Sequence, residues 1–173
     1  VIRADPACQK VMAEHKAYFK EEFKERAVDG NEAGNEPTWT LEVMMADFLE
    51  RKLLKDVIVH PTPSVAGTTP PDVHSNLSWL DAKGAFTKCQ NLREGRDTAE
   101  TSEGNETIDF DEFVICLGLI GHIKYEEIEE MSLADKVLAA VDNRLDESDE
   151  TAVISEAVVT APPRYAFDNA AQD

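Results

Sequence analysis

Apolar residues recur at intervals of three and four along most of this chain, which is the spacing of one face of a helix. In the second such segment Leu41, Met44, Met45 and Phe48 fall at i, i+3, i+4 and i+7. This periodicity predicts a chain built mainly of helices. The expected helices cover residues 6–27, 40–54, 76–92, 109–125 and 133–145, with one more short helix at 152–159.

Turn-forming and acidic segments interrupt the helical pattern. Residues 29–37 are rich in Asn, Gly and Pro, and residues 93–107 are polar and acidic, as is typical of loops. From His60 to Asp72 four prolines exclude a regular helix and predict a long connection. The order helix, loop, helix therefore occurs twice, once on each side of this connection.

The pattern predicts an all-α fold with five consecutive parts. Each helix–loop–helix unit forms one part, and the segments outside them form the others. The parts are a helix–loop–helix unit at 1–59, a Pro-rich linker at 60–75, a second unit with an enlarged loop at 76–125, a C-terminal helix at 126–147, and an acidic, extended tail at 148–173.

Two of the predicted helices carry their own start signals. Asp109 and Glu112 have the spacing of a capping box, in which two side chains accept each other's backbone N–H groups. Ser132 and Asp135 have the same spacing at the start of the fifth helix. Capping is by itself a sufficient explanation of these acidic residues, and it does not exclude a second role.

Residues 104–113, with the sequence GNETIDFDEF, resemble the end of an EF-hand calcium loop of the calmodulin type. In such a loop calcium takes about six to eight oxygens, including both oxygens of a glutamate at position twelve. With Glu112 at that position, the resemblance implies that Ile108 forms a short β contact beside Thr38 and Trp39. It also implies a set of calcium ligands, which are Glu103, Asn105, Thr107 through its carbonyl, Asp109 and Glu112.

Both candidate loops depart from the family's pattern. Position one of the second loop is Thr101 instead of an aspartate, and position six is Glu106 instead of the glycine that makes the sharp turn. In the first loop position twelve is Thr40, which has no carboxylate. The resemblance therefore implies an EF-hand-like pair with degenerate loops, followed by a fifth helix and an extended tail.

Charge and cysteine content narrow the class of partner. The chain has 35 acidic and 17 basic residues, a net charge of −18, which disfavours nucleic acid and anionic lipid as ligands. Three cysteines without a CxxC spacing are typical of a reducing compartment. No secretory leader precedes the first helix, and no apolar run approaches the roughly 20 residues that span a bilayer. We therefore expect an intracellular protein without a membrane span.

Apolar residues outside the expected core predict a surface that binds other proteins. Val114, Ile115 and Leu119 lie off the core stripe of the fourth helix. Leu138 belongs to a narrow apolar seam on the fifth helix, and Tyr165 lies in the tail. These five residues are the predicted partner-binding site.

The sequence favours a non-catalytic structural or adaptor subunit that binds other protein subunits of a larger assembly. The resemblance implies a cytoplasmic, cytoskeletal or ciliary setting for such a protein. The alternative is a calcium-responsive regulator that binds Ca²⁺ at 101–112 and exposes an apolar groove for a target helix. No nucleophile motif or phosphate-binding loop is present, so we expect no enzymatic activity.

Overall fold

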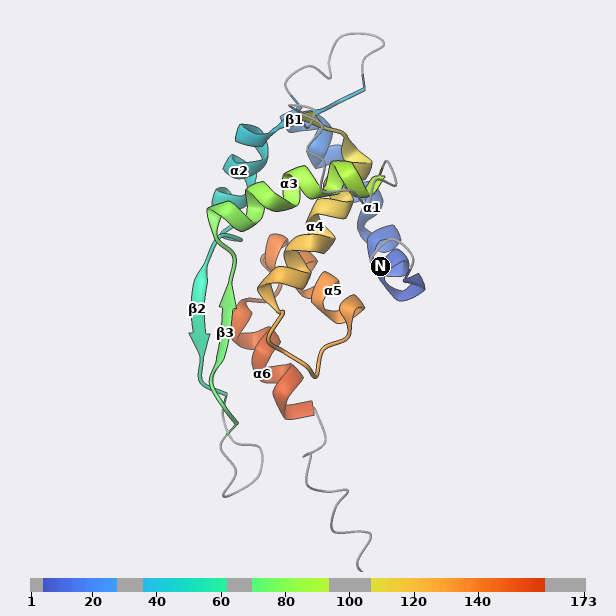
Figure 1. Ribbon diagram of the computed structural model, residues 1–173. Coiled ribbons are helices and arrows are strands. Elements are labelled where there is room, and N and C mark those ends of the chain that lie inside the picture. The colour runs from blue at the N-terminus through green and yellow to red at the C-terminus, as the bar shows by residue number, and fades with distance from the viewer. Residues whose placement is uncertain (1–4, 28–35, 62–69, 94–106, 161–173) are drawn as a thin grey trace, which may run out of the picture.

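The computed structural model describes residues 5–27, 36–61, 70–93 and 107–160, and most of these residues are helical (Figure 1). The prediction of a mostly helical chain is therefore confirmed. The helices are α1 (Pro6–Arg26), α2 (Leu41–Glu50), α3 (Trp79–Arg93), α4 (Phe110–Lys124), α5 (Leu133–Arg144) and α6 (Glu150–Thr160).

Local capping explains where several of these helices begin. The Asp5 carboxylate accepts the N–H of Ala7 at 2.8 Å, and Pro6 occupies the first turn of α1, where a missing N–H costs nothing. The Thr40 hydroxyl caps α2. The predicted capping box of Ser132 and Asp135 is present at the start of α5, where each side chain accepts the other's backbone N–H.

Two small antiparallel sheets accompany the helices, so the fold is not purely helical in the described ranges. Strand β1 (Trp39–Thr40) pairs with β4 (Thr107–Ile108), with Trp39 opposite Ile108. The predicted contact of Trp39 with the Ile108 strand is thus confirmed. This short pairing joins the chain just before α2 to the chain just before α4.

The second sheet is a hairpin that the sequence analysis did not predict. Strand β2 (Asp56–Val59) pairs with β3 (Val73–Asn76), and it stands beside the helices in Figure 1. Strand β3 therefore occupies the end of the expected 60–75 linker. Helix α3 begins at Trp79, three residues later than the expected start at residue 76. The physical reason is burial at alternate positions, since Val73 and Ser75 face inward while their neighbours are exposed.

Residues 150–160 form α6, which agrees with the short helix predicted at 152–159 and shows that the part expected as an extended tail from residue 148 begins with a helix. The helix packs against β2, and Ile154 is fully buried. The rest of the expected tail lies outside the described residues. Buried residues of α6, of the hairpin and of the end of α4 pack together in a second, smaller core. This core consists of Val59, Val73, Tyr125, Ile128, Ala139 and Ile154.

The larger core lies among α1, α2, α3 and α4. Phe23 stacks on Trp39 with ring centroids 4.6 Å apart, and Phe113 contacts both rings. The indole N–H of Trp39 donates to the Phe23 carbonyl at 2.9 Å, so this buried ring leaves no unpaired donor. Because Trp39 belongs to β1 and Phe113 to α4, the aromatic cluster ties the two helix–loop–helix units together.

Helix α4 lies at the centre of the molecule, with α3 crossing it and α5 beside it (Figure 1). At Gly121 a Cβ atom would lie 2.4 Å from the Lys136 carbonyl oxygen, so only glycine permits this approach of α4 to α5.

Even α4 falls short of a membrane span, since none of the helices in the described ranges is long and apolar enough to cross a bilayer.

Candidate functional site

The junction of β4 and α4 holds the best-matching part of the candidate calcium loop. Ile108 is fully buried opposite Trp39, and the next residue, Asp109, is the N-cap of α4. The carboxylate of Asp109 accepts the Glu112 N–H at 2.9 Å, and the carboxylate of Glu112 accepts the Asp109 N–H at 2.9 Å. The predicted capping box is therefore confirmed, and it fixes the direction in which α4 leaves the loop.

Only part of the predicted calcium-ligand set falls on described residues. Glu103 and Asn105 lie outside them, Thr107 lies in β4, and Asp109 and Glu112 form the capping box. One oxygen of Glu112 already accepts a backbone N–H, whereas a bidentate ligand would present both oxygens to the ion. In the parts of the chain that the structure describes, no group of three or more His, Cys, Asp or Glu side chains could hold a metal ion.

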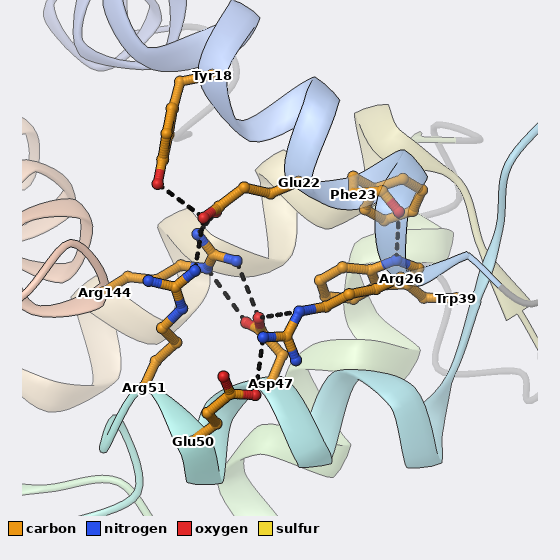
Figure 2. A network of polar contacts seen from close by, with 9 residues as sticks. All are labelled: Tyr18, Glu22, Phe23, Arg26, Trp39, Asp47, Glu50, Arg51 and Arg144. Carbon is orange, nitrogen blue, oxygen red and sulfur yellow. Dashed lines mark hydrogen bonds and ion pairs between the residues drawn. The ribbon is translucent and has the colours of Figure 1, made fainter.

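A buried network of charged side chains joins α1, α2 and α5, and Figure 2 shows it from close by. Arg144 of α5 lies at its centre and is 1% exposed. Its guanidinium donates to both oxygens of Asp47, at 2.9 and 3.2 Å, and to Glu22 at 2.5 Å. Asp47 is fully buried, so these bonds replace the water that its charge would otherwise require.

Two further arginines close the network at its edges. Arg51 donates to Glu22 at 2.5 Å, and Arg26 donates to Glu50 at 2.7 Å while its Nε lies 3.5 Å from Asp47. Burial alone would raise the pKa of Glu22, but hydrogen bonds from Arg144 and Tyr18 and the charges of Arg144 and Arg51 outweigh it, so the pKa is lowered. Glu22 is therefore ionised at neutral pH.

The guanidinium of Arg144 also lies close to two aromatic rings. Its central carbon is 5.0 Å from the ring centroid of Phe19 and 5.6 Å from that of Phe113. The attraction of a planar cation to aromatic faces adds to the carboxylate bonds. The geometry suits guanidinium better than the compact ammonium group of lysine.

A second buried network fastens α6 to the end of α4. Lys124 donates to Glu150 at 2.7 Å and to Asn143 at 3.1 Å, and Lys55 approaches the other Glu150 oxygen at 3.0 Å. Burial lowers the pKa of Lys124, although the contact with Glu150 opposes the shift. The Tyr125 hydroxyl donates to the same Asn143 oxygen at 2.5 Å. Polar bonds thus hold the helices around the smaller core in register.

The predicted partner-binding residues do not form one exposed patch. Leu119 is 7% exposed and belongs to the larger core, which corrects its assignment to the surface. Val114 and Ile115 are partly buried against the same core, and Leu138 is 36% exposed. Tyr165 lies outside the described residues. Leu119, Val114 and Ile115 are covered because α4 is packed on several sides within this chain, by α3 and α5 among others.

Glu22, Asp47 and Arg144 were not among the predicted site residues, although the sequence positions of two of them carry a signal. Asp47 lies three positions after Met44 and directly before Phe48, which places a charge on an apolar helix face. Arg144 follows Val141 by three positions and is likewise on the buried face of its helix. A charged residue in an apolar stripe predicts a buried partner.

No family model, no curated protein and no solved structure matches the chain. The resemblance to EF-hand loops therefore rests on residues 104–113 of the sequence.

Proposed function

We propose that this chain is a non-catalytic structural or adaptor subunit that binds other protein subunits of an intracellular assembly through a degenerate EF-hand-like scaffold. The observation that carries the proposal is the pairing of β1 with β4. It joins two helix–loop–helix units at the residues, Trp39 and Ile108, where paired EF-hands make their β contact. A cytoskeletal or ciliary assembly is the setting that the resemblance implies.

The position of α5 favours an adaptor over an open sensor. Helix α5 packs on α4 and α1, and its Arg144 is held by carboxylates of α1 and α2. The apolar surface that a calcium-responsive protein would uncover for a target is therefore already covered within the chain. A scaffold of this kind is suited to presenting a constant outer surface to its partners.

Several large apolar side chains remain on that outer surface. Trp79 is 50% exposed and Leu80 is 76% exposed at the start of α3, and Leu49 is 61% exposed at the end of α2. Aromatic and aliphatic residues of this size supply much of the binding energy at protein interfaces. These residues, with Leu138 of α5, are the candidates for contact with a partner subunit.

Substituting Leu80 with aspartate tests this proposal, with Leu138→Asp as the second variant. Each substitution should weaken capture of the partner from native extract by about tenfold or more, because a charge is expensive in an apolar interface. The melting temperature should change little, because both side chains are exposed. Lys83→Asp, which changes the charge at an exposed position of α3, is the control.

Quantitative pull-down followed by mass spectrometry supplies the measurement. A full-length chain that remains monomeric in native extract, with no partner at stoichiometric level, contradicts the proposal. Equal capture by the wild type, Leu80→Asp and Leu138→Asp would instead place the interface elsewhere and reject these residues as its centre.

A calcium-responsive regulator is the second candidate function, and the position of Glu112 in the resembling loop is what motivates it. Glu112 is 9% exposed at the expected twelfth position, next to the paired strands. Glu112→Gln keeps a residue that is compatible with the capping box but removes the carboxylate. If calcium binds at 101–112, isothermal calorimetry at millimolar Ca²⁺ should give heat with the wild type, and Glu112→Gln should abolish it.

A matched control for the calorimetry is Glu130→Gln, which removes one exposed acid far from the junction. This control should leave the heat unchanged if the ion binds at the loop. No heat with the wild type would eliminate the calcium-responsive function. Equal loss in both variants would attribute the binding to the overall charge of −18 and not to the loop.

A further inference from the structure

Helix α5 divides its charged residues between two sides. Its two bases, Lys136 and Arg144, are both buried, where Lys136 donates to the Glu126 carbonyl and Arg144 joins the network around Asp47. Its two acids are Asp135, which is exposed, and Asp142, which is half-buried. The interior of the molecule therefore uses both positive charges of α5, and the side toward solvent keeps both negative ones.

The outward face of α5 is a continuous stripe along the helix. We define it as Ala134, Asp135, Leu138, Asp142 and Leu145. All five are exposed or half-buried, whereas the other residues between 136 and 144 are buried. The three apolar residues follow one another by four and seven positions, and the two acids are seven positions apart, so all five lie on one side of the helix.

The apolar row of this face is only partly covered by the chain itself. Leu138 is in neither hydrophobic core of the described residues, although Val137 and Ala139 on either side of it are buried. Leu145 packs against the larger core with part of its side chain. An apolar row at near-heptad spacing with charged residues along its edge is the kind of surface on which a second helix packs lengthwise.

The acidic row of the same face has no matching base. In the described part of the chain neither Asp135 nor Asp142 forms an ion pair with a lysine or an arginine. One oxygen of Asp135 accepts the Ser132 N–H and hydroxyl, and the other is left for a partner. Burial and the charge of Glu147 raise the pKa of Asp142, although the charge of His15 opposes the shift. A cation brought to this face would therefore meet two carboxylates that lack one.

We propose that the outward face of α5 is the docking site for a basic amphipathic helix of a partner subunit. The helix lies along α5, covers Leu138 with apolar residues and pairs its lysines or arginines with Asp135 and Asp142. Charge complementarity selects this occupant, because an acidic helix, or a second copy of a chain with a net charge of −18, would be repelled.

The inference rests on the proposed adaptor function, because it names the class of partner that contacts Leu138. The face is distinct from the apolar groove of a calcium-responsive regulator, since α5 follows the two helix–loop–helix units and presents here the side that does not pack on α4.

Two synthetic peptides titrated into the full chain test the inference. The first is a fluorescent amphipathic helix of three heptads, with leucine at two positions of each heptad and lysine at the flanking positions. The second has glutamate in place of every lysine. Fluorescence anisotropy should show that the lysine peptide binds at least about tenfold more tightly than the glutamate peptide.

Three variants of the chain locate the binding of the lysine peptide. Leu138→Ala should weaken it by about tenfold, because an apolar contact is lost. Asp142→Asn should weaken it by about threefold, the effect of one partly exposed ion pair. The same variant should not lower the melting temperature, because it removes the repulsion by Glu147. Glu42→Gln, which removes one exposed acid of α2, is the control and should leave binding unchanged.

Three results would overturn the inference. The first is equal binding of the two peptides, and the second is no binding of the lysine peptide at about 1 mM. The third is equal weakening by Asp142→Asn and Glu42→Gln, which would attribute the binding to the overall charge of the chain. The adaptor function is tested separately, by capture of a partner from native extract, so it would stand if a partner were captured and the peptide failed.

Discussion

Replacing Arg144 with alanine should destabilise the protein by about 3–5 kcal/mol, because it leaves Asp47 buried without the two nearest donors of its hydrogen bonds. Asp47 has no exposed surface, so water cannot replace these bonds without opening the contact between α2 and α5. The cation over Phe19 and Phe113 is lost as well. Urea unfolding followed by circular dichroism measures the difference.

The matched control for this substitution is Arg26→Ala. Arg26 belongs to the same network, but its side chain is 28% exposed and its closest partner, Glu50, is 64% exposed. Its Nε also lies 3.5 Å from Asp47, and without it Asp47 would keep both shorter bonds from Arg144. Exposed pairs contribute little, so this change should cost less than about 1 kcal/mol. An Arg144→Ala cost no larger than that of Arg26→Ala would contradict the view that the buried contacts hold α5 in place.

A double-substitution cycle separates the pairing from the burial. Arg144→Met and Asp47→Leu each leave a charged partner behind, whereas the double variant removes both and places apolar groups of similar size at the contact. The cost of the double variant should fall below the sum of the single costs by about 0.5–3 kcal/mol. Additive costs would mean that Arg144 and Asp47 act independently.

Replacing Gly121 with alanine should destabilise the protein by about 1–3 kcal/mol, although alanine is the better helix former. The added Cβ would lie 2.4 Å from the Lys136 carbonyl oxygen and 2.9 Å from its carbon. Both atoms belong to the backbone of α5, so the whole helix has to move. This shift would disturb the seating of Arg144 as well.

Gly84→Ala is the control, because the same substitution in the interior of α3 meets no atom within 4 Å. It should stabilise the protein by about 0.5–1 kcal/mol by removing the backbone freedom of glycine. The two glycine variants are therefore expected to change the unfolding free energy in opposite directions. A stabilising Gly121→Ala would show that α4 and α5 do not approach as closely as described.

The sequence determined the elements whose causes are local. The caps at Asp109 and Ser132 lie three positions from their partners, and helix periodicity extends over neighbouring turns, so a short window contains all the information. The pairing of Trp39 with Ile108 was also predicted, because the resemblance of residues 104–113 to an EF-hand loop implies a β contact at Ile108. The β2–β3 hairpin was missed because prolines dominated the segment between its strands.

Only the tertiary structure decided which charged and polar groups are buried. Lys124 and Tyr125 are 1% and 0% exposed because Glu150 of α6 and Asn143 bond to them, and no local pattern marks a lysine at the end of a helix as buried. Leu119 likewise lies in the core and not on an outer face.

The candidate site depends on the same kind of information. Arg144 meets Asp47 and Glu22 across 97 and 122 residues of chain, and no local pattern encodes such a distance. The sequence by itself determined that helices form and, through their capping boxes, where α4 and α5 begin. Which helix covers α4, and which arginine neutralises Asp47, depended on the packing of α5 against α1, α2 and α4, because burial of a charge is favourable only once its partners have been brought to it.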